Sequence, residues 1–111
     1  MFSKDQRITK NEDFQNIYKN GRYYFIDCFK IFILENSLKK TRFSVIASKK
    51  TLPLAIQRNS IKRKLRDFFH KNHAFLPKNT DILIIILNKK ALSSTKEDFQ
   101  KILLKINPKT K

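Results

Sequence analysis

The stretch "DILIIIL", residues 81–87, contains the longest apolar run of the chain, and the prediction of the fold starts from it. Six consecutive apolar residues are far fewer than the roughly 20 that a helix needs to span a bilayer. A short continuous apolar run is typical of a strand that is buried on both faces of a sheet. We therefore expect residues 81–87 to form a central strand.

The segment before this strand, "QRNSIKRKLRDFFH" (residues 57–70), has the period of a helix with two different faces. Pro53 fits a helix start. An apolar stripe about 100° wide, as expected of a core-facing helix, comprises Leu54, Ile61, Leu65, Phe68 and Phe69. The neighbouring arc is polar and comprises Asn59, Lys62, Arg63, Arg66 and His70. Arg58 falls inside the apolar arc, so it lies at the border of the stripe or on an irregular first turn.

The N-terminal half predicts one helix followed by strands. Asn11 is a candidate cap for a helix over residues 12–20, and Gly21 is typical of a helix end. Residues 22–35 and 42–48 alternate with period two around a turn-forming "ENSLKK", which indicates an antiparallel meander of two or three strands. Near the C-terminus, "SSTKEDFQKILLKI" indicates a last helix with its apolar stripe at Phe99, Ile102, Leu103 and Ile106.

The order helix, two or three strands, helix, strand, helix predicts an α+β sandwich, a small sheet with helices packed on it. We found no internal repeat, and the chain contains one glycine and three prolines. Its length of 111 residues suits one domain, so we expect residues 1–111 to form a single unit. The single cysteine, Cys28, allows no disulfide within a monomer and is expected to be a small buried residue.

Charge is the dominant feature of the composition. Twenty-five Lys and Arg residues against nine Asp and Glu residues give a formal net charge of +16. Such charge destabilises a compact state by self-repulsion, and we expect a polyanion to be the normal partner. Nucleic acid is the first candidate and an anionic membrane surface the second. The N-terminus has no apolar segment typical of a signal peptide, which together with the lone cysteine predicts a cytoplasmic protein.

The positive charge is concentrated in residues 39–71, where eleven basic residues accompany one acidic residue, Asp67. Ion pairing cannot account for these cations, so we interpret the polar arc of the helix as a binding face for an anion. Aromatic residues lie next to cations in "RYYF" (residues 22–25) and in Phe29-Lys30, and Phe32 shares a strand face with Lys30. Such platforms hold single-stranded nucleic acid. Phe29, Phe43, Phe68, Phe99 and Phe25 are expected in the core, whereas the pair Phe14 and Tyr18 is undecided between core and surface.

Catalytic chemistry by side chains is weakly supported. His70 and His73 lie three residues apart near the end of the basic helix, without an evident third ligand or acidic partner. Histidines at a helix end commonly act as cations near the negative end of the dipole. We found no glycine-rich phosphate loop, paired-cysteine motif or nucleophile elbow. We expect no catalytic residue and no metal ligand in the protein itself.

Four segments, in this order, resemble the protein subunit of bacterial ribonuclease P: "RITKNEDFQNIYKNGR", "RFSVIASKK", "AIQRNSIKRKLRDFF" and "LPKNTDILIII". The resemblance covers nearly the whole chain. It implies an αβββαβα fold around a four-stranded sheet, with a left-handed crossover through the basic helix, an exception to the usual hand. It departs from the family in two places. Ser60 stands where the family usually has an arginine, and "TLPL" replaces a shorter connector that contains glycine.

The resemblance also implies a function in the maturation of tRNA. In that family an RNA subunit uses Mg²⁺ to remove the 5′ leader of precursor tRNA, and the protein binds the leader and supports the RNA and its metal ions. The expected partners are therefore ribonuclease P RNA and precursor tRNA, with no membrane and no obligate protein partner. The residues expected to face the catalytic RNA are Arg58, Asn59, Lys62, Arg63 and Arg66, with Lys49 and Lys50 as a basic pair nearby. The residues expected to line the leader cleft are Phe14, Tyr18, Phe32 and Lys30.

Two alternatives stay open from the sequence. A structural RNA-binding protein, such as a ribosomal protein, has the same composition, and only the ordered motifs favour the ribonuclease P reading. A protein endonuclease that uses His70 and His73 is the third hypothesis.

Overall fold

A computed structural model describes residues 6–38 and 40–106 of the 111-residue chain. The predicted order of elements is confirmed. The helices and strands are α1 (Asn11–Asn20), β1 (Arg22–Ile26), β2 (Phe29–Glu35), β3 (Arg42–Ile46), α2 (Ala55–Lys71), β4 (Thr80–Ile86) and α3 (Lys96–Ile106). Two short 3-10 helices, η2 (His73–Phe75) and η3 (Lys89–Ser93), flank β4.

The four strands form one sheet in the order β1-β2-β4-β3. β4 is central as predicted, antiparallel to β2 and parallel to β3. The expected meander is wrong in its third strand, because β3 pairs with β4 and has no pairing with β2. The most apolar strand takes the middle position, where both of its faces are covered. The chain reaches β4 from β3 through α2, and the hand of this crossover stays a prediction.

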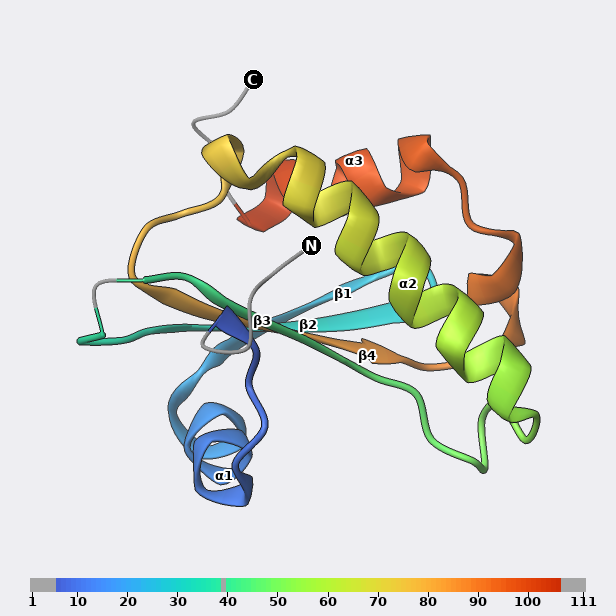
Figure 1. The fold of residues 1–111 in the computed structure, drawn as a ribbon, viewed down its shortest axis with the longest axis horizontal. Coiled ribbons are helices and arrows are strands. Elements are labelled where there is room, and N and C mark those ends of the chain that lie inside the picture. Colours follow the sequence, from blue (N-terminus) through green and yellow to red (C-terminus); the bar gives the residue numbers. More distant parts are fainter. Residues whose placement is uncertain (1–5, 39, 107–111) are drawn as a thin grey trace.

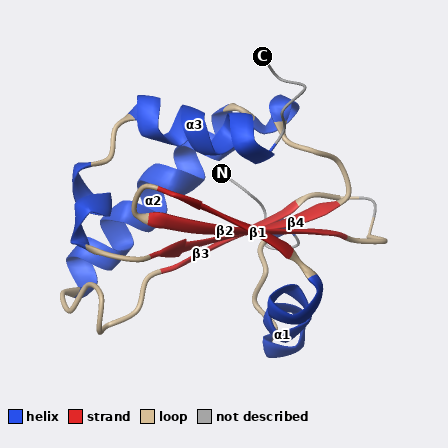
Figure 2. Cartoon of the chain, turned by 180° about the vertical axis from the view of Figure 1, so that it is seen from behind, coloured by secondary structure: helices blue, strands red, loops and turns tan. Residues whose placement is uncertain are grey.

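The helices divide between the two faces of the sheet. α2 and α3 cover one face and α1 lies against the other, as Figure 1 shows from one side and Figure 2 from behind. The main core lies under α2 and α3, with Phe29, Phe43, Leu65, Phe69 and Ile84 among its buried members. A smaller cluster lies under α1 and comprises Ile8, Ile17, Phe32 and Leu83. The sheet therefore carries two separate apolar layers.

The apolar stripe of α2 is confirmed at Ile61, Leu65, Phe68 and Phe69, all of which are buried. Leu54 was wrongly included, since its side chain is 61% exposed. Leu54 occupies the N-cap position with extended backbone, φ −86° and ψ 126°, so the geometry of a helical wheel does not apply to it.

The ends of α1 differ from the prediction. Lys10 occupies the N-cap position with no side-chain hydrogen bond, and Asn11 is the first helical residue, not the cap. Gly21 does end the helix, but its φ of −76° is accessible to any residue. Its requirement is space, because a Cβ at this position would lie 2.6 Å from the carbonyl oxygen of Ile17 and 3.3 Å from that of Ile33.

A buried ion pair ties α1 to the sheet. The Arg42 guanidinium donates to both carboxylate oxygens of Asp81, at 2.8 and 2.7 Å, and to Asp13 of α1 at 3.0 Å. These bonds, that to Asp81 first, raise the pKa of Arg42 above its ordinary value although burial opposes them. Asn36 also donates to Asp81, at 2.7 Å. Asp81 is only 2% exposed, so it depends on these partners for its solvation.

Replacing Arg42 with Met should strongly destabilise the protein, because it leaves the carboxylate of Asp81 buried with no charged partner. We expect a loss of about 3–5 kcal/mol in the free energy of unfolding, measured by urea denaturation. The matched control is Arg63→Met on the exposed side of α2, which should change stability by less than about 0.5 kcal/mol. Equal losses in the two variants would contradict the proposed role of Arg42.

Candidate nucleic-acid interface

The face of the sheet that carries α1 also carries a group of aromatic side chains. Phe14 and Tyr18 are one turn apart on α1, and Phe32 lies on β2 below them. Tyr18 is 41% exposed, and its ring packs edge-on against Phe32 with 5.4 Å between centroids. Burial raises the pKa of the Tyr18 hydroxyl. Phe32 itself is only 5% exposed, so it supports its neighbours and offers little ring surface to a ligand.

Lys30 brings a positive charge to the same face. Its Nζ lies 4.9 Å from the ring centroid of Phe32 and 4.6 Å from that of Tyr23 on β1. The structure thus groups Tyr18, Phe32 and Lys30 as the sequence predicted, with Phe14 half buried beside them. Phe25 was predicted to be in the core, but it is 62% exposed. Its strand β1 is the edge of the sheet, so Phe25 has a neighbouring strand on one side only.

A groove connects the α1 face to α2. It has a volume of about 420 Å³ and is lined by Phe14, by backbone and side chains of β3, and by the cations Arg7, Lys62 and Arg66. Its described lining includes no carboxylate. Burial and the neighbouring charges of Arg66 and Arg58 lower the pKa of Lys62. Burial and the charge of Arg7 likewise lower the pKa of Arg66, opposed by Asp67. The groove therefore concentrates mutually repelling cations, which an anion would stabilise.

Arg7 is a site residue that the sequence analysis missed. Its backbone pairs with Phe43 of β3, which fixes the segment beside the groove. Its Nε is buried. Among the buried side-chain nitrogen and oxygen atoms of the described residues, it is the one without a hydrogen-bond partner. A buried donor without a partner costs free energy, and it is a natural position for a ligand oxygen. Arg7 begins the segment "RITKNEDFQNIYKNGR" that resembles the family, but it precedes the first helix and belongs to no periodic pattern, so the sequence assigned it no role.

The remaining predicted RNA-facing residues do not line this groove. Asn59 and Arg63 are exposed on α2, and Lys49 and Lys50 are exposed in the turn that follows β3. Ser48 closes that turn by accepting from the Thr51 N–H at 3.1 Å. Arg58 differs from the others, because one of its Nη atoms donates to the carbonyl oxygens of Leu52 and Pro53 at 2.8 and 2.9 Å. Arg58 therefore holds the "TLPL" connector against the first turn of α2.

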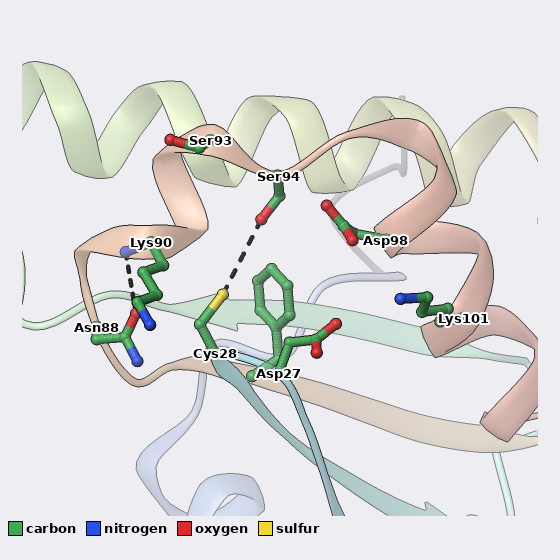
Figure 3. Close-up of a pocket in the computed structure, with 9 residues that line it drawn as sticks. Asp27, Cys28, Asn88, Lys90, Ser93, Ser94, Asp98 and Lys101 are labelled. Atoms are coloured by element: carbon green, nitrogen blue, oxygen red, sulfur yellow. Dashed lines mark hydrogen bonds between the residues drawn. The ribbon is translucent and has the colours of Figure 1, made fainter.

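A second recess, of about 400 Å³, lies at the β1–β2 hairpin and the start of α3 (Figure 3). Cys28 is 5% exposed there, as predicted, and its Sγ lies 4.0 Å from the hydroxyl of Ser94. Burial raises the pKa of the thiol, so the reactive thiolate is disfavoured. Asp98 caps α3 by accepting from the Thr95 N–H at 2.8 Å, which lowers the pKa of its carboxyl. These groups are used in capping and packing.

The two histidines lie against each other at the end of α2 and the start of η2. The rings of His70 and His73 stack with centroids 5.8 Å apart, and Nδ1 of His73 lies 2.8 Å from the carbonyl oxygen of His70. Within residues 6–38 and 40–106, no three His, Cys, Asp or Glu side chains are grouped so that they could hold a metal ion. No helix in the same residues is long and apolar enough to cross a membrane.

Comparison with known proteins identifies the family to which this chain belongs. The family model for ribonuclease P matches residues 2–110. The chain belongs to the ribonuclease P protein family. Among curated relatives, the ribonuclease P protein component of Fusobacterium nucleatum subsp. nucleatum is 42% identical over 82 residues, 74% of this chain and 73% of that protein. The component from Aliivibrio salmonicida is 31% identical over 105 residues, 95% of this chain and 88% of that protein.

Solved structures of the family share the fold. The RNase P protein of Staphylococcus aureus superposes with a TM-score of 0.77 at 31% identity, covering 96% of this chain and 95% of that one. The protein from Thermotoga maritima gives a TM-score of 0.78 at 25% identity, covering 90% and 96%. The predicted α+β class with a four-stranded sheet is thereby confirmed.

The groove gives a prediction about salt dependence. Lys62→Ala and Arg66→Ala should each weaken binding to RNA and reduce the slope of log K against log salt by roughly one unit, because each removes a phosphate contact. Lys64→Ala is the matched control, a cation of the same helix that does not line the groove. Binding isotherms at a series of salt concentrations measure both quantities. If Lys64→Ala reduces the slope as much as the other two, the groove has no special role.

Proposed function

We propose that this chain is the RNA-binding protein subunit of ribonuclease P and assists removal of the 5′ leader from precursor tRNA. Membership of the family supports this role. The observation that carries it is the groove in which Arg7, Lys62 and Arg66 converge without a lining carboxylate. Such a site favours the phosphate backbone of RNA, and ribonuclease P RNA is the partner that the family's name implies.

The α2 side of the groove suits the catalytic RNA. Arg63 and Asn59 project from α2 outside the groove, and Lys49 and Lys50 extend the basic surface past the end of β3. Arginine forks bind phosphate oxygens in pairs, whereas lysines act as point charges that attract without fixing orientation. Arg58 contributes mainly by positioning the connector, since part of its guanidinium is already bonded there. We therefore assign the specific docking contacts to Arg63 and Arg66 before Arg58.

The α1 side suits the leader, which is single-stranded RNA. Tyr18 offers an exposed ring, Phe14 lines the groove, and Lys30 supplies a cation among the rings. Bases stack on aromatic rings without much sequence preference while their phosphates bind nearby cations. Because Phe32 is buried, we assign it a positioning role beneath Tyr18. The groove between the two sides leads from one RNA surface to the other.

Chemistry is proposed to reside in the RNA subunit with its Mg²⁺ ions. Within the described residues no three potential ligands are grouped, and the carboxylate of Asp13 is bonded to Arg42. What the protein supplies is charge. Its cations reduce the repulsion between substrate and catalytic RNA, which lowers the concentration of Mg²⁺ that the complex requires.

Reconstitution with a bacterial ribonuclease P RNA tests the proposal. At low Mg²⁺ the protein should stimulate 5′-leader removal from precursor tRNA, and it should cleave nothing without the RNA. Absence of stimulation would refute the proposed function and favour a different RNA-binding role. Cleavage by the protein alone would indicate a protein nuclease.

The double variant His70→Ala, His73→Ala provides the companion prediction. It should keep most of the stimulation, because the two rings are stacked on each other near the end of α2 and His73 Nδ1 lies against the backbone carbonyl of His70. The comparison uses single-turnover rates of the reconstituted enzyme at matched Mg²⁺. A loss of 100-fold or more (about 2.7 kcal/mol in activation free energy) with the fold intact would indicate a catalytic role for the histidines.

A further inference from the structure

The edge strand β1 presents two large aromatic side chains to solvent. Tyr23 is 56% exposed and Phe25 is 62% exposed. They pair in register with Phe32 and Lys30 of β2, which places them on the face that carries α1. The alternate residue Tyr24 turns to the opposite face, where it packs against the main core. Large exposed apolar side chains are unfavourable in water, and two neighbouring ones mark a contact surface.

These two rings continue the aromatic group under α1. Ring centroids are 5.4 Å apart from Tyr18 to Phe32, 5.7 Å from Phe32 to Tyr23, and 5.8 Å from Tyr23 to Phe25. The series runs from α1 across β2 to the edge of the sheet. Phe32 is the buried ring of this series. It supports the exposed ring of Tyr18 on one side and that of Tyr23 on the other.

Lys30 supplies the charge at this edge. Its Nζ lies 4.6 Å from the centroid of Tyr23 and 5.3 Å from that of Phe25, within the range of cation–π contacts. Among the described ion pairs, none involves Lys30. The rings hold the ammonium in place while its charge remains without a carboxylate. An incoming phosphate would provide that counterion.

An edge strand can instead pair with a second copy of the chain. Charge disfavours that occupant, because each chain has a net charge of +16 and two copies repel each other. A single-stranded polyanion with flat bases satisfies both features, the exposed rings and the cation between them.

We propose that Tyr23, Phe25 and Lys30 form a second base-stacking platform for single-stranded RNA, beyond the cleft formed by Phe14, Tyr18 and Phe32. This inference rests on the proposed function and deepens it, since it extends the leader site to the edge strand. The planes of Tyr23 and Phe25 are 86° apart, so the two rings present differently oriented surfaces to neighbouring bases. The phosphate between those bases binds Lys30. A leader must be long enough to reach β1 before this platform contributes.

The experiment measures the affinity of the reconstituted ribonucleoprotein for precursor tRNAs whose leaders lengthen one nucleotide at a time. With the shortest leaders, the double variant Tyr23→Ala, Phe25→Ala should bind as tightly as the wild type. Once the leader reaches β1, the variant should bind about 5- to 150-fold more weakly, the effect expected when one stacked base is lost. Both rings are exposed, so the melting temperature should change little.

Three controls define the outcome. Tyr23→Phe with Phe25→Tyr should retain the long-leader affinity, whereas Leu at both positions should lose it, because Leu has no ring face. Phe75→Ala removes an exposed aromatic from η2 and should have no effect. The inference is overturned if the loss is the same at every leader length, if Leu restores affinity, or if the variants alter the oligomeric state. Failure of the wild type to stimulate the RNA at all would instead refute the proposed function.

Discussion

Burial of β4 between β2 and β3 is the constraint on which the rest of the structure depends. Its side chains are covered on both faces, so the sheet must carry helices on both sides. Because β4 is parallel to β3, the connection between them has to cross over the sheet, and α2 makes that crossing on one face. The basic helix is thereby fixed beside β3, while α1 covers the other face. One buried strand thus separates the surface that we propose for the catalytic RNA from the surface that we propose for the leader.

Electrostatic repulsion is the cost of this design. Arg7, Lys62 and Arg66 line one groove whose described lining includes no carboxylate. Burial makes the charged forms of Lys62 and Arg66 less favourable. Arg42, in contrast, is compensated and structural, since it is bonded to Asp81 and Asp13 and holds α1 on the sheet. Cations paired within the protein stabilise the fold, and unpaired ones are left for phosphate.

Local periodicity predicted much of this structure, and non-local pairing accounts for most of the errors. The buried stripe of α2 and the central strand follow from patterns within single segments. The pairing of β3 with β4 joins segments that α2 separates, and no local pattern encodes it. Phe25 was expected in the core because it is an apolar residue in an aromatic segment. Its side chain is exposed because β1 is the edge strand, and the order of the strands cannot be read from a single segment. The lining of the groove was likewise predicted only in part. Lys62 and Arg66 share one arc of a helix, whereas Arg7 belongs to a segment far away in the sequence.

The central claim is that the two faces contact different RNAs, and cross-linking tests it most directly. A photoactivatable group would replace Tyr18 on α1 or Arg63 on α2 in the assembled complex of protein, ribonuclease P RNA and precursor tRNA. The account predicts that the group at position 18 cross-links to the leader and the group at position 63 to the catalytic RNA. Cross-links from both positions to the same RNA would contradict it.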